Sequence, residues 1–224
     1  MGEVLDAASQ ATASAAGAAV AAAAEAATFL GALRCADATP LSDADYEHLA
    51  STLHCDANVL KAVAEVESGH NAFAADGRPI IAYERHRFYA FTDGKFGVDD
   101  EISNPQRGNY TTDQSKSWDR LARAYALDKE AALKSVSWGR FQLMGENYAG
   151  CGYSSVEDYV KDLSKSEQGQ FAGFEKFIHM KPPLLAAIQQ KNWREIAHYY
   201  NGAGNIDDYA PKLEKAYTKL SPHV

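Results

Sequence analysis

Apolar residues recur with a helical period over residues 57–68, and one carboxylate lies on the apolar face. The apolar positions three and four residues apart are Leu60, Val63 and Ala64. Glu67 continues the same stripe, and Asp56 before the run and Gly69 after it are typical of a helix start and stop. A buried, unpaired charge is costly, so Glu67 should keep its proton near neutral pH and suit general acid catalysis. The alternative is that Glu67 turns toward solvent at the helix end or caps neighbouring backbone groups.

Glu65 lies on the opposite side of the same predicted helix. It follows Lys61 by one turn, which predicts a solvated ion pair on the outer face. Chemistry is therefore expected from Glu67 and not from Glu65.

The remaining pattern predicts a mainly α fold (α+β) with a small β region. Further helices are expected over these stretches: one from Ser42 and Asp45 onward, one or two within 117–136, then 154–165, 166–179 and 193–202. Turn residues at 76–79 open a β-favouring run that continues to residue 91. Residues 92–114 are polar and predict a long loop of the kind that often binds ligands.

An alanine-rich tract over residues 7–31 precedes these elements. Alanine favours helix but offers little to bury, so residues 1–40 are predicted to be a helical extension or linker and 41–224 the folded catalytic domain. The start "MGEVLD" lacks the positive charge of a secretory signal, and Glu25 interrupts the only apolar run, so no stable membrane insertion is expected. A weak export or anchor segment stays open as an alternative.

Composition removes several classes of function. The formal net charge of -8, without a basic stripe, argues against nucleic-acid binding. The cysteines Cys35, Cys55 and Cys151 form no CxxC pair; free thiols are expected, with a Cys35–Cys55 bridge as the alternative. The seven histidines contain no HExxH, and no phosphate or dinucleotide loop occurs, so neither a metal nor a cofactor is predicted.

Three short motifs in order resemble one superfamily. They are "ESG" at 67–69, "SWGRFQLMG" at 137–145 and "YYNGAGN" at 199–205. This order is similar to goose-type lysozymes and soluble lytic transglycosylases of the lysozyme-like superfamily. Together with "DGRPIIAYERHRFY" at 76–89, the motifs look like the N-acetylmuramidase domain of phage endolysins and of some secreted bacterial effectors. The resemblance implies a helical bundle around a substrate groove, with a small β-hairpin region.

The resemblance also implies roles for individual residues. Glu67 would be the general acid, in agreement with its place on the apolar face. The other residues that the resemblance places at the site are Ser68, which would fix it by hydrogen bonding, Gly139 and Gln142 on the groove floor, and Tyr200 and Asn201 facing Glu67. The glutamine would contact sugar or neighbouring backbone. The Tyr200 phenol needs a partner when buried, and the Glu67 carboxyl is the candidate.

A second carboxylate distinguishes hydrolysis from lytic transglycosylation, which needs no water-activating base. Glu84 in "YERHRF" is the choice, because the resemblance implies a glutamate at this place. If the stretch is a strand, Glu84 shares a partly apolar face with Ile80, Ala82, His86 and Phe88. The alternative is a structural ion pair between Glu84 and Arg85, Arg87 or His86. Rival bases on the following loop are Asp93, Asp99, Asp100 and Glu101.

Several aromatic residues could stack on sugar rings. They are Tyr110, Trp118, Trp138 and Tyr148, of which most should be core; Trp138 is the best candidate because it lies within the groove motif. His86 is a further candidate for the site, with a satisfied buried imidazole as the alternative.

The resemblance implies a muramidase that cleaves the β-1,4 bond between N-acetylmuramic acid and N-acetylglucosamine. Peptidoglycan glycan strands would be its partner, and we expect a monomer made in the bacterial cytoplasm that acts in the periplasm or cell wall. A phage endolysin is the favoured setting. The alternatives are a lytic transglycosylase on the same scaffold, an antibacterial secreted effector with an inhibitory immunity protein, and, more remotely, a non-catalytic peptidoglycan-binding module.

Overall fold

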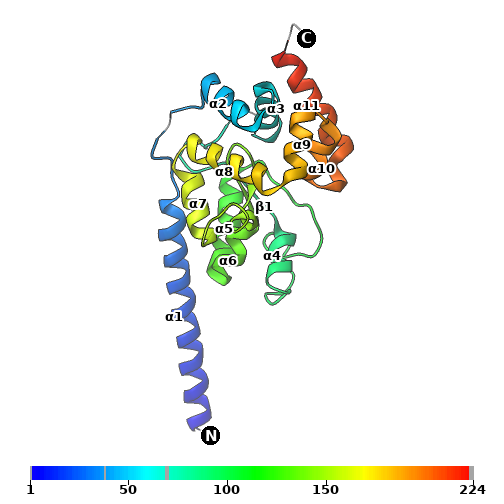
Figure 1. Ribbon diagram of the computed structural model, residues 1–224. Helices are drawn as coiled ribbons and strands as arrows, with labels where there is room; N and C mark the ends of the chain where they lie inside the picture. Colours follow the sequence, from blue (N-terminus) through cyan, green and yellow to red (C-terminus); the bar gives the residue numbers. More distant parts are fainter. Residues whose placement is uncertain (1, 38, 69–70, 222–224) are drawn as a thin grey trace. The chain divides into compact units, whose positions relative to one another are not determined.

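The computed structural model describes residues 2–37, 39–68 and 71–221, and their side chains except those of 2–13, 15 and 68. The chain divides into two compact units. Figure 1 labels their helices and strands. Unit 1 consists of Met1–Leu33 and Ala82–Val136, and unit 2 of Arg34–Ile81 and Ser137–Val224. Each unit therefore contains two separate pieces of the chain.

Unit 1 is built from four helices in its described part. They are α1 (Gly2–Ala32), α4 (Arg85–Phe91), α5 (Gln114–Leu127) and α6 (Lys129–Lys134). The last turns of α1 pack on α5, where the ring of Phe29 stacks on Tyr125 with 5.3 Å between centroids. Leu30 is 5% exposed, whereas Val20 further back along α1 is 70% exposed. The alanine-rich tract is thus helical, as predicted, and among its described side chains the buried ones lie toward the end of α1.

None of the described helices combines the length and the hydropathy that a bilayer span requires.

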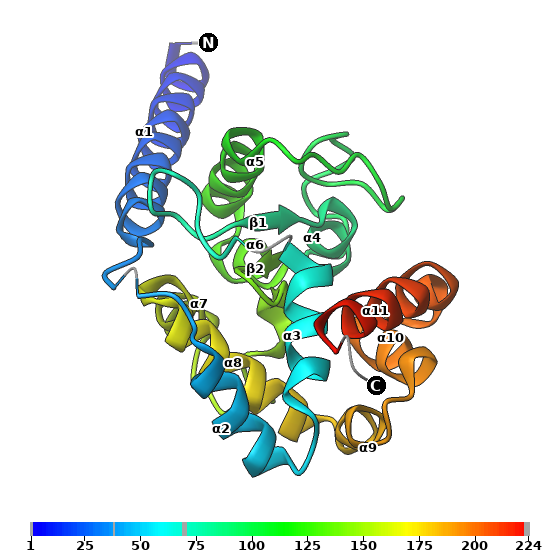
Figure 2. The same ribbon diagram turned by 90° about the horizontal axis from the view of Figure 1, so that it is seen from above.

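Unit 2 carries most of the helices. They are α2 (Asp43–Leu53), α3 (Ala57–Ser68), α7 (Val156–Lys165), α8 (Glu167–Met180), α9 (Pro182–Gln190), α10 (Trp193–Asn201) and α11 (Ile206–Leu220), with short 3-10 turns η1 (Gly145–Asn147) and η2 (Ala203–Asn205). The predicted caps are confirmed: Ser42 and Asp45 form a capping box, and Ser155 and Asn192 accept backbone N–H groups. Helix α3 packs against both α2 and α11 (Figure 2).

Three short strands form one sheet in the order β1–β2–β3. They are β1 (Ile81–Tyr83), β2 (Val136–Trp138) and β3 (Leu143–Met144). Strands β2 and β3 form an antiparallel hairpin in which Ser137 lies opposite Met144 and Trp138 opposite Leu143. The predicted small β-hairpin region is therefore present.

The predicted strand through residue 91 is wrong beyond Tyr83. The backbone N–H groups of Arg87 and Phe88 donate to the carbonyl of Glu84, and this begins α4. Glu84 consequently precedes a helix, and the proposed strand face shared by Ile80, Ala82, Glu84, His86 and Phe88 does not exist. The loop prediction holds better, because the fully described stretch 92–113 contains no helix or named strand.

Candidate active site

Helix α3 carries the candidate acid at its C-terminal end. The helix spans Ala57–Ser68, as the apolar period predicts, and Val59, Leu60 and Val63 are at most 1% exposed. Glu67 follows on this face and is half-buried. The predicted stop at Gly69 and the side chain of Ser68 lie outside the described residues.

The Glu67 carboxyl has a hydrogen-bond partner from the third motif. The side-chain amide Nδ2 of Asn201 donates to Oε1 of Glu67 at 2.7 Å. Burial raises the pKa of Glu67 to about 7, and the Asn201 hydrogen bond and the charge of Lys212 oppose this rise. A large share of Glu67 is therefore protonated near neutral pH.

Helix α10 positions Asn201 and the neighbouring Tyr200. Gly202 ends this helix with φ of 89°, as predicted for a stop residue. The hydroxyl of Tyr200 donates to the backbone carbonyl of Phe141 at 2.6 Å, so its expected hydrogen bond to Glu67 is wrong. The pKa of Tyr200 is raised, mainly by burial and to a smaller extent by the charge of Glu67. The two side chains therefore still influence each other.

Asn201 also keeps an unused acceptor. Its Oδ1 is buried and has no hydrogen-bond partner among the described residues. A side-chain amide whose nitrogen holds a carboxyl and whose oxygen is unpaired can accept a hydrogen bond from a bound molecule.

The second motif forms the turn of the β2–β3 hairpin. Gly139 has φ of 68°, and a Cβ at this position would lie 2.3 Å from Cδ of Gln170. The close approach predicted for this glycine is therefore made to Gln170, whose Oε1 accepts the N–H of Arg140 at 2.7 Å. Gln142 donates from Nε2 to the carbonyl of Gly139 at 2.8 Å, which is the backbone contact that was one of its two predicted roles.

Trp138 is fully buried, with 0% of its surface exposed. A ring without exposed surface cannot stack on a sugar, so this prediction is wrong and Trp138 belongs to the core. Trp118 is also core, at 3% exposure. Tyr110 is 56% exposed and Tyr148 is partly exposed, so both can still contact a ligand.

Glu84 lies in unit 1 between β1 and α4. Its backbone N–H donates to the Ser135 carbonyl at 2.8 Å, and its side chain is 19% exposed. The hydroxyl of Tyr110 donates to Oε2 of Glu84 at 2.9 Å, and Nδ1 of His86 lies 3.2 Å from the same oxygen. Burial raises the pKa of Glu84; the Tyr110 hydrogen bond opposes this, as do the charges of Arg107 and Arg87.

Three of the four rival loop carboxylates form ion pairs with arginines of unit 1. Arg85 pairs with Asp100 at 3.3 Å, and Arg123 pairs with Asp99 at 3.0 Å and with Glu101 at 2.7 Å. Three of the rival loop carboxylates thus hold the loop in shape. His86 has both ring nitrogens buried without a hydrogen bond, and burial lowers its pKa to about 4, so it is neutral at physiological pH.

Two relationships were missed from the sequence. Tyr110 was considered only as a stacking residue, and nothing in a 26-residue separation indicated its hydrogen bond to Glu84. Glu65 was expected to be solvated and paired with Lys61. Instead, its side chain is 22% exposed and pairs with Lys219 at 3.1 Å, while Lys61 pairs with Asp43 at 2.6 Å.

The potential metal ligands are scattered in the described part of the chain. No three of its His, Cys, Asp and Glu side chains are grouped to hold a metal ion. The cysteines Cys35, Cys55 and Cys151 are free thiols.

Comparison with known proteins decides the family. The family model described as N-acetylmuramidase matches residues 56–221, which include all three motifs. The chain belongs to the N-acetylmuramidase family. The crystal structure of the Burkholderia AP3 phage endolysin is 35% identical and matches with a TM-score of 0.73 over 83% of this chain and 72% of that chain. No curated protein sequence matches.

Membership of the N-acetylmuramidase family confirms the resemblance seen in the motifs, and the structural match confirms the mainly helical, lysozyme-like fold. Membership of the family also supports peptidoglycan cleavage as the activity. The roles of individual residues remain predictions.

Proposed function

We propose that this N-acetylmuramidase family member hydrolyses the β-1,4 bond between N-acetylmuramic acid and N-acetylglucosamine, with Glu67 as general acid. The observation that carries the proposal is the state of the Glu67 carboxyl. It is desolvated at the end of an apolar helix face, hydrogen-bonded by Asn201, and has a pKa of about 7. A carboxylic acid that keeps its proton at neutral pH can protonate a leaving oxygen.

The first step breaks the bond between C1 of the muramic acid and the glycosidic oxygen. Glu67 gives its proton to that oxygen, which leaves as the 4-hydroxyl of N-acetylglucosamine, and positive charge develops at C1. Glu67 becomes a carboxylate at this moment. The N–H of Asn201 stabilises that negative charge, because a hydrogen bond to an ionised acceptor is stronger than one to a neutral acceptor.

A water molecule then completes the reaction at C1. In an inverting hydrolase a second carboxylate takes a proton from this water. We assign this role to Glu84, from its own surroundings in unit 1. Burial is the largest influence and raises the pKa of Glu84, while the Tyr110 hydroxyl and the positive charges of Arg107 and Arg87 oppose this rise and support the ionised form that a base requires.

The remaining site residues are proposed to support the acid. The Gly139–Gln142 turn is held by its own hydrogen bonds and by Gln170, and Tyr200 ties α10 to that turn through the Phe141 carbonyl. These contacts hold Asn201 and Glu67 in a fixed relation. The setting that we favour is a phage endolysin acting on the cell wall, as the solved relative is a phage endolysin; a secreted effector would instead require an immunity protein.

Products formed in oxygen-18-labelled water test the reaction. Hydrolysis at the proposed bond yields muramic acid reducing ends that carry one labelled oxygen, which mass spectrometry detects. Anhydromuramic ends without label would show lytic transglycosylation and overturn the hydrolase proposal. Labelled glucosamine ends would overturn the bond specificity.

A further inference from the structure

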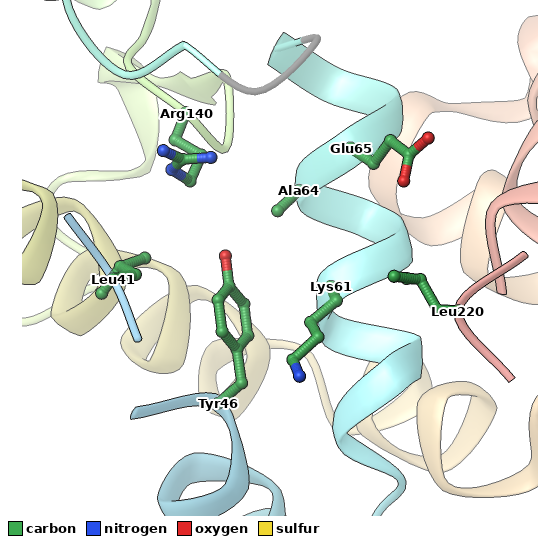
Figure 3. A pocket seen from close by; sticks show the side chains of 7 residues that line it. All are labelled: Leu41, Tyr46, Lys61, Ala64, Glu65, Arg140 and Leu220. Atoms are coloured by element: carbon green, nitrogen blue, oxygen red, sulfur yellow. The ribbon is translucent and has the colours of Figure 1, made fainter. Parts of the chain in front are cut away.

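A cavity of about 200 Å³ lies within unit 2 beside α3. Its lining residues are Leu41, Tyr46, Lys61, Ala64, Glu65, Arg140 and Leu220 (Figure 3). Water occupies roughly 30 Å³ per molecule in the liquid, so the cavity has room for a small group of non-hydrogen atoms rather than for a sugar chain. None of the roles assigned above uses it.

Tyr46 points an unused hydroxyl at this cavity. The residue is only 7% exposed, and its ring packs edge-on against Phe171 with 5.0 Å between centroids. Figure 3 shows the hydroxyl directed toward Arg140. No described residue forms a hydrogen bond with this hydroxyl. The hydroxyl therefore faces the space of the cavity, where a bound group or water can form a hydrogen bond with it.

Arg140 presents a second donor. Its Nε and Nη2 both donate to Oε2 of Glu167, at 3.1 and 2.8 Å, and its side chain is 13% exposed. Its other terminal nitrogen, Nη1, has no hydrogen-bond partner among the described residues. A guanidinium carries five N–H donors in one plane, so Arg140 can bind a further carboxylate through Nη1 while it holds Glu167.

Lys61 lines the cavity from α3. Its ammonium lies 5.8 Å from the centroid of the Tyr46 ring and pairs with Asp43 at 2.6 Å. This ammonium is directed away from the Tyr46 hydroxyl and from Arg140 (Figure 3), so Tyr46 and Arg140 are the two donors that face each other across the cavity.

Negative charge in the lining is turned elsewhere. Glu65 directs its carboxylate away from Tyr46 and Arg140 (Figure 3) and pairs with Lys219 at 3.1 Å. The other lining side chains are aliphatic: Leu41, Ala64 and Leu220. The cavity therefore combines hydrogen-bond donors with short apolar walls.

We propose that this cavity binds a small carboxylate on a short aliphatic arm, such as the C-terminal alanine of a peptide. Tyr46 and Arg140 would donate to the carboxylate, and Ala64 and the two leucines would contact the methyl group. If the proposed function is correct, the source is the peptide stem attached to the glycan strand. A free small carboxylate from solution is the other source of the same chemistry.

Titration of the whole chain with D-alanyl-D-alanine, followed by NMR, tests the carboxylate. We expect saturable shifts, binding of the C-terminal amide analogue at least about tenfold weaker, and Tyr46→Phe at least about fivefold weaker, because each change removes a charge-assisted hydrogen bond. Tyr89→Phe, outside the cavity, should bind as the parent does. Equal binding of acid and amide, or unchanged binding by Tyr46→Phe, would overturn the proposal.

Kinetics on two substrates distinguish the sources. If the stem peptide is bound, Tyr46→Phe raises KM for peptidoglycan with intact stems and leaves KM unchanged for glycan stripped of its peptides. If Tyr46→Phe leaves the KM of the parent unchanged on both substrates, the cavity is assigned to free carboxylates. Glu67→Gln should keep dipeptide binding without turnover, so failure of the catalytic proposal and failure of this site give different results.

Discussion

The side-chain amide of Asn201 donates a 2.7 Å hydrogen bond to Oε1 of Glu67. The contact joins the C-terminal ends of α10 and α3, which are 134 residues apart in the sequence. Burial favours the neutral acid and this donor favours the carboxylate, so the pKa of about 7 results from two opposing effects. Both can be changed separately by mutation.

Asn201→Ala should raise the pKa of Glu67 further, because the donor that stabilises the carboxylate is lost. A general acid is active when protonated, so the descending limb of kcat/KM against pH should move upward by roughly one pH unit. Measurement of kcat/KM across the pH range checks this. If the descending limb of Asn201→Ala lies at the same pH as that of the parent, Asn201 does not affect the pKa of the general acid.

Glu67→Gln should stabilise the fold at alkaline pH. The folded pKa of about 7 lies above the ordinary value of 4.5, so the stability contributed by neutral Glu67 is fully present below pH 4.5 and is lost as pH rises to about 7. Glutamine never ionises. We expect the variant to gain about 2 to 3 kcal/mol over the parent at high pH, from the 1.36 kcal/mol per pKa unit.

Urea unfolding of the parent and Glu67→Gln at about pH 4 and about pH 8.5 measures this gain. At the acidic value, ionisation should contribute almost no difference between the two proteins. A difference that is the same at both pH values would show that Glu67 is not desolvated in the folded chain.

Tyr110→Phe should raise the pKa of Glu84, because the hydroxyl that donates to Oε2 at 2.9 Å favours the charged form. A general base is active when ionised, so the ascending limb of kcat against pH should move to higher pH. The pH range of activity should become narrower. The descending limb set by Glu67 should not move. If Tyr110→Phe lowers activity by the same factor at every pH, Tyr110 does not act through the pKa of Glu84.

Gly139→Ala should destabilise unit 2 strongly, by about 3 kcal/mol or more. The added Cβ would meet the Gln170 amide at 2.3 Å in a backbone with φ of 68°. Gly77→Ala is the matched control, since Gly77 has φ of 81° and nothing within 4 Å of the added Cβ. It should cost only about 1 kcal/mol, from backbone strain alone. Equal losses in thermal unfolding would contradict the packing role of Gly139.

Local patterns predicted the elements that depend on local physics. The apolar stripe of α3 and the caps at Ser42, Ser155 and Asn192 required only helical periodicity and backbone hydrogen bonding. The same stripe indicated Glu67, because a carboxylate at a core-facing position has no local explanation.

Long-range contacts escaped prediction for a physical reason. Tyr200 found the Phe141 carbonyl rather than Glu67, and Trp138 is core rather than ligand-facing, because packing between distant segments determines both. The β-favouring run through Glu84 failed as well, since residues 85–91 gain helical hydrogen bonds that single-residue preferences do not report. The order of motifs indicated the family but not which side chain bonds to which.

Digestion of purified peptidoglycan by the parent, Glu67→Gln and Glu175→Gln tests the central claim most directly. Glu175 is a carboxylate on α8 whose side chain is 41% exposed, so its glutamine variant controls for the loss of a charge. We predict that Glu67→Gln loses activity by at least about a hundredfold, in the range of general acid catalysis, while remaining folded, and that Glu175→Gln digests as the parent does. Release of muramic acid reducing ends by folded Glu67→Gln at the parental rate would contradict the account.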